Sequence, residues 1–314
     1  NEGWGRLDKT YLDYLDDVKK DRTPVVLVGA NDGMLHAFDG SPEGGQELFA
    51  YVPSMVHENL PELAEPDYVH RFFVDGQITV ADAKPGSSWK TVAVGGLGGG
   101  GKGIFALDIT NPTSFGSGDV LWELDADDDG DIGHVYDEPL ITRLPDGEWV
   151  VIFANGFNSD DDQAHLFIVD LGTGEVKQKI ALGDAGDNGL ASSAALIDPQ
   201  SRLFTRRVYA GDLQGNVWAV EFNDTGTGSS RFGANKPLIN VGRPVVAPPI
   251  LAPNPGGGLM VYFGTGKLIE TTDRLQTDPP LEQFFAVRDR GNAFNSLNSL
   301  AVAEVTGSGA NRSV

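Results

Sequence analysis

The stretch RVYAGDLQGNVWAVE, residues 207–221, has an apolar run, a glycine-containing turn and an alternating apolar run. Alternation of this kind on either side of a turn predicts two antiparallel strands joined as a hairpin. The pattern recurs as VVLVGANDGMLHAFD at 25–39, TVAVGGLGGGGKGIFALD at 91–108, WVVIFANGFNSDDDQAHLFIVD at 149–170, and MVYFGTGK at 260–267 resumed by FFAVRD at 284–289. One predicted hairpin therefore occurs five times along the chain.

Shorter strand-like segments flank these hairpins. DEPLITRL (137–144), ASSAALID (191–198) and PVVAPPIL (244–251) precede a hairpin, whereas ELFAYV (47–52), VLWELD (120–125) and EVKQKIAL (175–182) follow one. Units of four strands that repeat every ~50–70 residues are typical of a β-propeller, and a β-sandwich would not predict one hairpin five times. We expect an all-β propeller of four-stranded antiparallel blades, about five of them visible. The first blade lacks an obvious innermost strand, so the ring is either incomplete or closed through unusual pieces.

The N-terminal segment has a different period. In LDKTYLDYLDDVKK (7–20) the larger apolar residues recur at helical spacing, at Leu7, Tyr11, Tyr14, Leu15 and Val18. This spacing predicts a short amphipathic helix. We therefore divide the chain into an N-terminal segment, 1–24, and a propeller domain, 25–314.

The composition limits the partners. The formal net charge of −22 repels phosphate backbones and anionic lipid surfaces, so no nucleic-acid partner is expected, whereas hard cations and basic protein surfaces are favoured. The chain has no cysteine, which excludes disulfides and thiolate metal sites. No apolar run reaches about 18 residues, so no transmembrane segment is predicted. The opening NEGWG has no signal-peptide pattern, which fits a mature domain or a fragment.

The stretch DADDDGDIG, 125–133, places five aspartates in seven positions, so either water screens them or a cation neutralises them. Calcium loops use oxygen ligands at positions 1, 3, 5 and 7 and a bidentate acid at position 12. Counting from Asp125, the pattern predicts side-chain ligands from Asp125, Asp127 and Asp129 and the backbone carbonyl of Asp131. Position 12 is a tyrosine, so water, Asp137 or Glu138 would have to complete the shell. A weak Ca²⁺ site and a solvated acidic loop both remain open at this point.

Motifs for catalysis are weak. GGLGGGGK (95–102) has the spacing of a phosphate-binding loop, but Gly103 follows where Ser or Thr is needed, and a strand follows where a helix is required. The five histidines show no H-x-x-x-H pair, and no G-x-S-x-G elbow occurs.

The hairpins also resemble the blades of quinoprotein dehydrogenases, which hold pyrroloquinoline quinone and Ca²⁺. Those enzymes often carry adjacent cysteines and a regular Trp motif, which this chain lacks. We therefore expect no catalytic residues, no organic cofactor and no enzyme activity, with a quinoprotein-like dehydrogenase as the alternative.

Four segments are more specific than a generic blade: VVLVGANDGMLHAFDG (25–40), ANGFNS (154–159), VYAGDLQGNVW (208–218) and VYFGTGKLIE (261–270). Together and in this order they resemble the C-terminal propeller of the PilY/PilC family of type IV pilus proteins. The resemblance implies a non-enzymatic factor in pilus assembly, adhesion and twitching motility, with calcium involved in switching. It also implies minor pilins at the pilus tip and a host-cell or abiotic surface as partners. The implied location is extracellular at the pilus tip, or the periplasm or outer membrane.

The family's usual calcium loop corresponds to DPQSRLFTRRVY, 198–209. Asp198 matches its first ligand, but Arg202 and Arg206 stand where the family has acids. A guanidinium has no acceptor to offer a metal. We therefore expect Asp198 to be the remnant of an unoccupied site, with an ion pair between Arg202 and Asp198 in place of the ion.

Overall fold

The computed structural model of the chain is dominated by β-strands. It describes residues 4, 8–186, 188–198, 204–223, 236–275, 281–289, 297, 300, 306–308 and 311–313. Among these residues, six antiparallel sheets follow one another, and within each sheet every strand pairs with its neighbour in the sequence. The predicted all-β architecture is confirmed.

Three central sheets have four strands each. The first contains β4 (Ile78–Ala83), β5 (Lys90–Gly96), β6 (Gly103–Asp108) and β7 (Val120–Asp125). The second contains β8 (Leu140–Arg143), β9 (Trp149–Ala154), β10 (Ala164–Asp170) and β11 (Val176–Leu182). The third contains β12 (Leu190–Asp198), β13 (Phe204–Asp212), β14 (Asn216–Glu221) and β15 (Lys236–Asn240). These are the predicted four-stranded blades.

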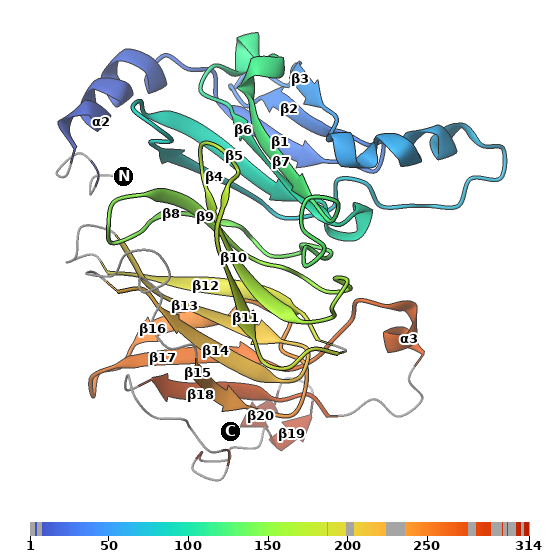
Figure 1. Cartoon of the computed structure of the whole chain (residues 1–314), viewed down its shortest axis with the longest axis vertical. Helices are drawn as coiled ribbons and strands as arrows, with labels where there is room; N and C mark the ends of the chain where they lie inside the picture. Colours follow the sequence, from blue (N-terminus) through green and yellow to red (C-terminus); the bar gives the residue numbers. More distant parts are fainter. Residues whose placement is uncertain are drawn as a thin grey trace.

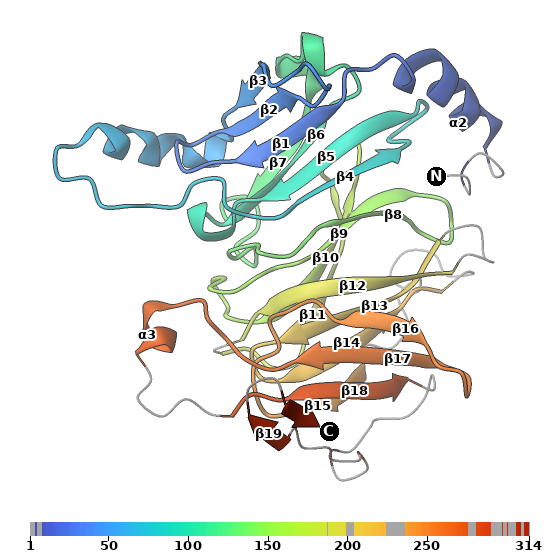
Figure 2. The same ribbon diagram turned by 180° about the vertical axis from the view of Figure 1, so that it is seen from behind.

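The outer sheets are smaller. A three-stranded sheet of β1 (Val25–Gly29), β2 (Leu35–Asp39) and β3 (Glu47–Tyr51) comes first, without the innermost strand that the sequence also lacked. The fifth sheet has β16 (Ile250–Pro253), β17 (Leu259–Gly264) and β18 (Phe284–Asp289), and β19 (Thr306–Ser308) pairs with β20 (Asn311–Ser313). The sheets succeed one another along the longest axis, and the last does not return to the first (Figures 1 and 2). The ring is therefore open over the residues that the structure describes.

The core lies between successive sheets. The inner hairpin strands are buried on both faces, as in β9 and β10, where Phe153 pairs with Phe167 and their rings stack with centroids 5.0 Å apart. This double burial explains why WVVIFA reads as a continuous apolar run rather than an alternating one. Four apolar clusters join consecutive sheets from β1–β3 through β16–β18. Each sheet is thus held mainly by its neighbours.

The predicted N-terminal helix is confirmed as α2 (Lys9–Tyr14), which continues as the π-helical turn η1 (Leu15–Lys19). The side chain of Asp8 caps it by accepting the Thr10 N–H at 2.9 Å. Tyr11 and Tyr14 are buried, and Tyr11 donates to Asp82 on β4 at 2.8 Å. These contacts dock the helix on the first four-stranded sheet. The boundary at residue 24 between an N-terminal segment and a propeller domain stays a prediction.

Helical turns elsewhere were not predicted. In the part of the chain that the structure describes, the longest is the 3₁₀ segment η2 (Ser54–Ala64). Shorter ones are η3 (Gly98–Gly100), η4 (Pro112–Ser114), η5 (Ser117–Asp119) and the α-turn α3 (Thr271–Arg274). Pro61 lies inside η2. η2 belongs to a long connection that projects from the side of the molecule between β3 and β4 (Figure 1). No helix among the described residues is both long enough and apolar enough to cross a bilayer.

A cavity of about 430 Å³ lies where the N-terminal segment meets the β4–β5 and β8–β9 turns. Trp4, Trp89 and Trp149 line it, with ring centroids 4.9–6.0 Å apart. The Trp89 indole N–H donates to Thr10 Oγ1 at 3.1 Å. Because the indoles pack on one another, they join the N-terminal segment to two neighbouring sheets.

Candidate metal centre

The acidic loop 125–133 connects β7 to β8 and lies against the tip of the β9–β10 hairpin. Asp160 on that tip donates its N–H to the Gly130 carbonyl at 2.9 Å. Gly133 donates to the Asn155 carbonyl and His134 to the Phe157 carbonyl, each at 2.9 Å. The loop is therefore held to the next blade by backbone hydrogen bonds.

Several loop carboxylates are used within the loop itself. Asp125 Oδ1 accepts the N–H groups of Asp127 at 2.8 Å and Asp128 at 3.3 Å. Asp129 Oδ1 accepts the N–H of Asp131 at 3.1 Å. These are the local turns that aspartate side chains commonly form with the backbone two residues on. They explain part of the aspartate content without a metal.

A lysine on a neighbouring strand forms ion pairs with two of the loop carboxylates. Lys179 on β11 places Nζ 2.8 and 2.9 Å from the two carboxylate oxygens of Asp129 and forms an ion pair with Asp131. Burial alone would lower the pKa of Lys179, but its hydrogen bonds to Asp129 and Asp131 outweigh burial and raise the pKa. An ammonium group therefore occupies the position that the sequence left open for a cation or water.

The structure does not gather the predicted calcium ligands. Among the described residues, the one group of three metal-ligating side chains with ligand atoms within 4.8 Å of one another is Asp131, Asp161 and His165. Asp125, Asp127 and Asp129 are not in it, and the Asp131 carbonyl already accepts the Asn155 side-chain N–H at 2.8 Å. Calcium binding by the four aspartates stays a prediction.

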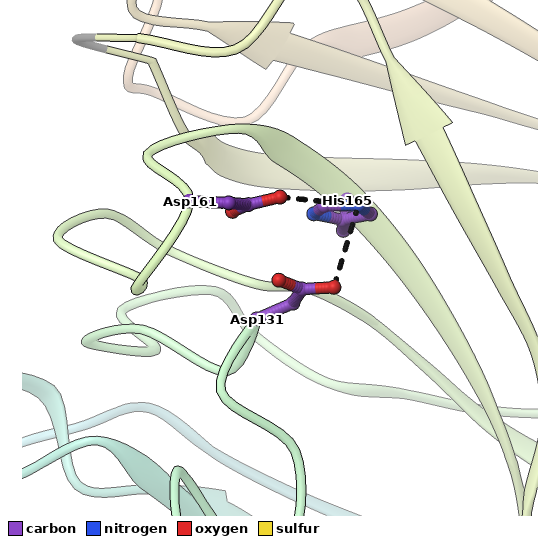
Figure 3. Close-up of side chains that lie close together, drawn as sticks. All are labelled: Asp131, Asp161 and His165. Atoms are coloured by element: carbon purple, nitrogen blue, oxygen red, sulfur yellow. Dashed lines mark ion pairs between the residues drawn. The ribbon is translucent and has the colours of Figure 1, made fainter.

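The group Asp131–Asp161–His165 joins three segments (Figure 3). His165 Nε2 lies 3.7 Å from Asp131 Oδ2 and 3.9 Å from Asp161 Oδ2. The His165 side chain is 5% exposed, whereas those of Asp131 and Asp161 are 21% and 36% exposed. The imidazole is thus the most buried of the three side chains, and the Asp161 carboxylate is the most exposed.

Asn155 positions the group from beneath and was missed by the sequence analysis. Its Oδ1 accepts the N–H groups of His165 at 2.9 Å and Leu190 at 3.1 Å. Its Nδ2 donates to the carbonyls of Asp131 at 2.8 Å and Gln163 at 3.0 Å. Asn155 is fully buried, and all four of its hydrogen-bonding positions are used. The Asn-Gly of ANGFNS marked a turn but gave no sign of this role.

Gly156, next to Asn155, shows why the turn needs glycine. Its φ is 76°, a left-handed conformation that a side chain disfavours. A Cβ there would lie 1.8 Å from the His134 carbonyl oxygen. The close approach of the hairpin to the segment after the acidic loop therefore depends on the missing side chain.

Asp137 is the other buried acid near the loop, and it faces the next blade. Its carboxylate accepts the N–H groups of Ala154 at 2.9 Å and Ser193 at 2.8 Å and the Ser193 hydroxyl at 2.8 Å. Burial raises its pKa to about 7, although these hydrogen bonds oppose the shift. Asp137 therefore links β9 to β12. It is not part of the Asp131–Asp161–His165 group.

The region of the family calcium loop is only partly described. The backbone of Asp198 ends β12 and pairs with Phe204. The side chain of Asp198 and residues 199–203, including Arg202, lie outside the described residues, and Arg206 lies on β13. The predicted loss of this calcium site and the predicted Arg202–Asp198 ion pair stay predictions.

The PilY1 β-propeller domain matches residues 8–293 of the chain. A "Type IV pilus biogenesis factor PilY1 homolog" of Xylella fastidiosa is 38% identical over 292 residues, which are 85% of this chain and 19% of that protein. "Type IV pilus biogenesis factor PilY1" of Pseudomonas aeruginosa PAO1 is 38% identical over 303 residues, or 87% of this chain and 26% of that protein. The chain thus spans about a fifth to a quarter of the length of these relatives.

The crystal structure of the P. aeruginosa PilY1 C-terminal domain is similar to this fold, with a TM-score of 0.76 and 32% identity. The alignment covers 93% of this chain and 62% of that one. A quinohemoprotein alcohol dehydrogenase of Comamonas testosteroni reaches a TM-score of 0.46 at 15% identity, too low to support any conclusion. On its sequence and its fold together, the chain belongs to the PilY1 β-propeller family.

Proposed function

We propose that this chain is the propeller module of a type IV pilus biogenesis factor and that it acts by binding rather than by catalysis. The observation that carries the proposal is the family match over residues 8–293, supported by 38% identity to proteins named as pilus biogenesis factors. The charge of −22 favours basic surfaces of protein partners. Minor pilins at the pilus tip are the proposed partners, and a host-cell or abiotic surface is the proposed target of adhesion.

The buried polar residues of the central blades support a binding role. The side chains of Asn155 and Asp137 form hydrogen bonds with backbone groups of neighbouring segments. Thr142 and Thr205 bond to each other at 2.6 Å across two blades. Buried side chains whose hydrogen bonds join neighbouring segments maintain the arrangement of the blades. We accordingly propose an extracellular, periplasmic or outer-membrane scaffold that presents an acidic surface.

The test is genetic complementation in the source bacterium. A strain lacking the full-length gene should regain surface pili and twitching with the intact gene, but not with a copy lacking the propeller. Purified full-length protein should retain minor pilins in a pull-down. Wild-type pilus yield and twitching in the propeller-deleted strain, with the rest of the protein present at normal level, would contradict the proposal.

The enzyme alternative has its own measurement. The chain is incubated with pyrroloquinoline quinone and Ca²⁺, and dye reduction is followed with alcohols and aldoses. We expect only the rate of the protein-free control. Turnover clearly above that control would replace the binding role with a dehydrogenase.

Calcium modulation is the finer part of the proposal. We assign it to the acidic loop, where a Ca²⁺ ion has to displace Lys179 from Asp129. The predicted shell also lacks a bidentate acid, so we expect weak binding, with a Kd of about 10⁻⁴–10⁻³ M. Repeating the pilin pull-down with Ca²⁺ and with chelator tests whether the ion affects partner binding.

A further inference from the structure

The Asp131–Asp161–His165 group contains a histidine whose hydrogen bonding the fold leaves incomplete. The His165 side chain is 95% buried, and its Nδ1 has no hydrogen-bond partner among the described residues. Its Nε2 faces two carboxylate oxygens at 3.7 and 3.9 Å, beyond the 2.7–3.2 Å of a nitrogen–oxygen hydrogen bond.

The spacing that is too long for hydrogen bonds suits a shared metal ion. Ligand atoms about 2.1 Å from a tetrahedral metal lie about 3.4 Å from one another. The Nε2–oxygen distances of 3.7 and 3.9 Å therefore need a contraction of only a few tenths of an ångström. From this geometry, we propose that Asp131, Asp161 and His165 form a binding site for a divalent transition-metal ion such as Zn²⁺.

The local charges match a dication. The carboxylates of Asp129, Asp131 and Asp161 contribute three negative charges, and Lys179 contributes one positive charge. Three negative charges and one positive charge leave a net charge of −2. The nearby Asp160 carboxylate is 3.7 Å from the ammonium of Lys102 and lies outside this balance. One divalent ion would make the centre neutral.

The donor set selects the type of ion. One imidazole with two carboxylates suits zinc and its first-row neighbours, whereas Ca²⁺ and Mg²⁺ prefer shells made of oxygen. The ligands also differ from those predicted for calcium, because Asp161 and His165 replace Asp125, Asp127 and Asp129. The two proposed sites share only Asp131, which would bind calcium through its backbone carbonyl and the transition metal through its side chain.

Hydrogen bonds hold the backbone of Asp131 and His165 and the side chain of Asp161, and Asp131 Oδ2 is paired with Lys179. Asn155 fixes the carbonyl of Asp131 and the N–H of His165. Asp161 Oδ1 accepts the Ser159 hydroxyl at 3.0 Å and the Gln163 N–H at 3.1 Å, which leaves Oδ2 toward His165. Ligands held this way lose little entropy on binding a metal. The bound ion would clamp the acidic loop to the β9–β10 hairpin, and water on the Asp161 side would complete its shell.

The test is Zn²⁺ binding to the tag-free 314-residue chain, in competition with a chromophoric chelator at pH 7.5. We expect one Zn²⁺ per chain, bound at least 30-fold more weakly after Asp161→Asn and after His165→Gln. Asp161→Asn keeps the oxygen that caps the hairpin turn and lies at an exposed tip, so the fold should survive it. Asp160→Asn, one residue away and with the same charge change, is the matched control and should alter affinity less than twofold.

Three results would overturn the proposal. One is the absence of Zn²⁺ binding by the wild-type chain, which would leave His165 as a structural side chain between two acids. Another is equal weakening by Asp160→Asn and Asp161→Asn, which would indicate diffuse attraction to the acidic surface. The third is tighter binding of Ca²⁺ than of Zn²⁺ at the same residues. A Zn²⁺-dependent shift of the His165 Nε2 resonance in the wild type would support direct ligation.

Discussion

Replacing Asn155 with leucine tests a set of four side-chain hydrogen bonds at the middle of the three central sheets. Leucine has a similar volume but offers no hydrogen bond, so it strands two buried N–H groups, those of His165 and Leu190. A buried unpaired group costs about 1–3 kcal/mol. The carbonyls of Asp131 and Gln163 are on half-exposed residues and can turn to water. We expect Asn155→Leu to lower the free energy of unfolding by about 2–6 kcal/mol.

The measurement combines urea denaturation with hydrogen exchange. Exchange at the amides of His165 and Leu190 should accelerate more than at distant β2 amides, because their acceptor is gone. Asn111→Leu, at an exposed turn, is the control and should change stability by less than about 0.5 kcal/mol. If the two variants unfold within 1 kcal/mol of each other, Asn155 does not hold the three segments together and our account of the centre is wrong.

Three further predictions concern the charges around this centre. Lys179→Met removes the ammonium between Asp129 and Asp131, so it should lower the melting temperature more than Lys177→Met, whose partner Glu175 is exposed, with the difference read by calorimetry at low salt. For Asp137, the pKa of about 7 in the fold lies above the value of 3.8 expected when unfolded, so its contribution to stability falls as the pH rises from about 4 to 7. Asp137→Asn should therefore flatten the wild-type decline between pH 5 and 7, and parallel curves for the two proteins would count against the shift. For calcium, titration calorimetry should show one weak site that disappears in the double variant Asp127→Ala/Asp129→Ala, and an identical melting temperature in millimolar Ca²⁺ and in chelator would favour a solvated loop.

The sheets were predictable because their signals are local. A strand, a glycine turn and a second strand lie within about 15–20 residues, and burial on both faces leaves a continuous apolar run. The N-terminal helix was equally visible from the spacing of Tyr11 and Tyr14. The sequence could also show the missing inner strand of the first sheet, since no apolar segment stands there.

The contacts among the acidic loop, Lys179, His165 and Asn155 were not predictable, because these residues are far apart in the sequence. Lys179 lies 50 residues from Asp129, and nothing in EVKQKIAL indicates which of its two lysines faces the acidic loop. A calcium-loop pattern counts consecutive positions, so it selected Asp125, Asp127 and Asp129 and could not include His165 from the next blade. Asn155 gave a turn signal, but its four contacts depend on how three blades pack.

The open succession of sheets has a consequence for how this chain unfolds. Each blade packs mainly on the one before and the one after, so its stability approximates a sum of single-blade terms and nearest-neighbour interface terms, as in linear repeat arrays. A terminal blade has one such interface and an inner blade has two. Denaturation should therefore proceed inward from the ends through partly folded arrays, with the β8–β11 and β12–β15 pair, tied by Asp137 and Asn155, melting last. A single cooperative transition with equal calorimetric and van't Hoff enthalpies would show instead that the blades behave as one unit.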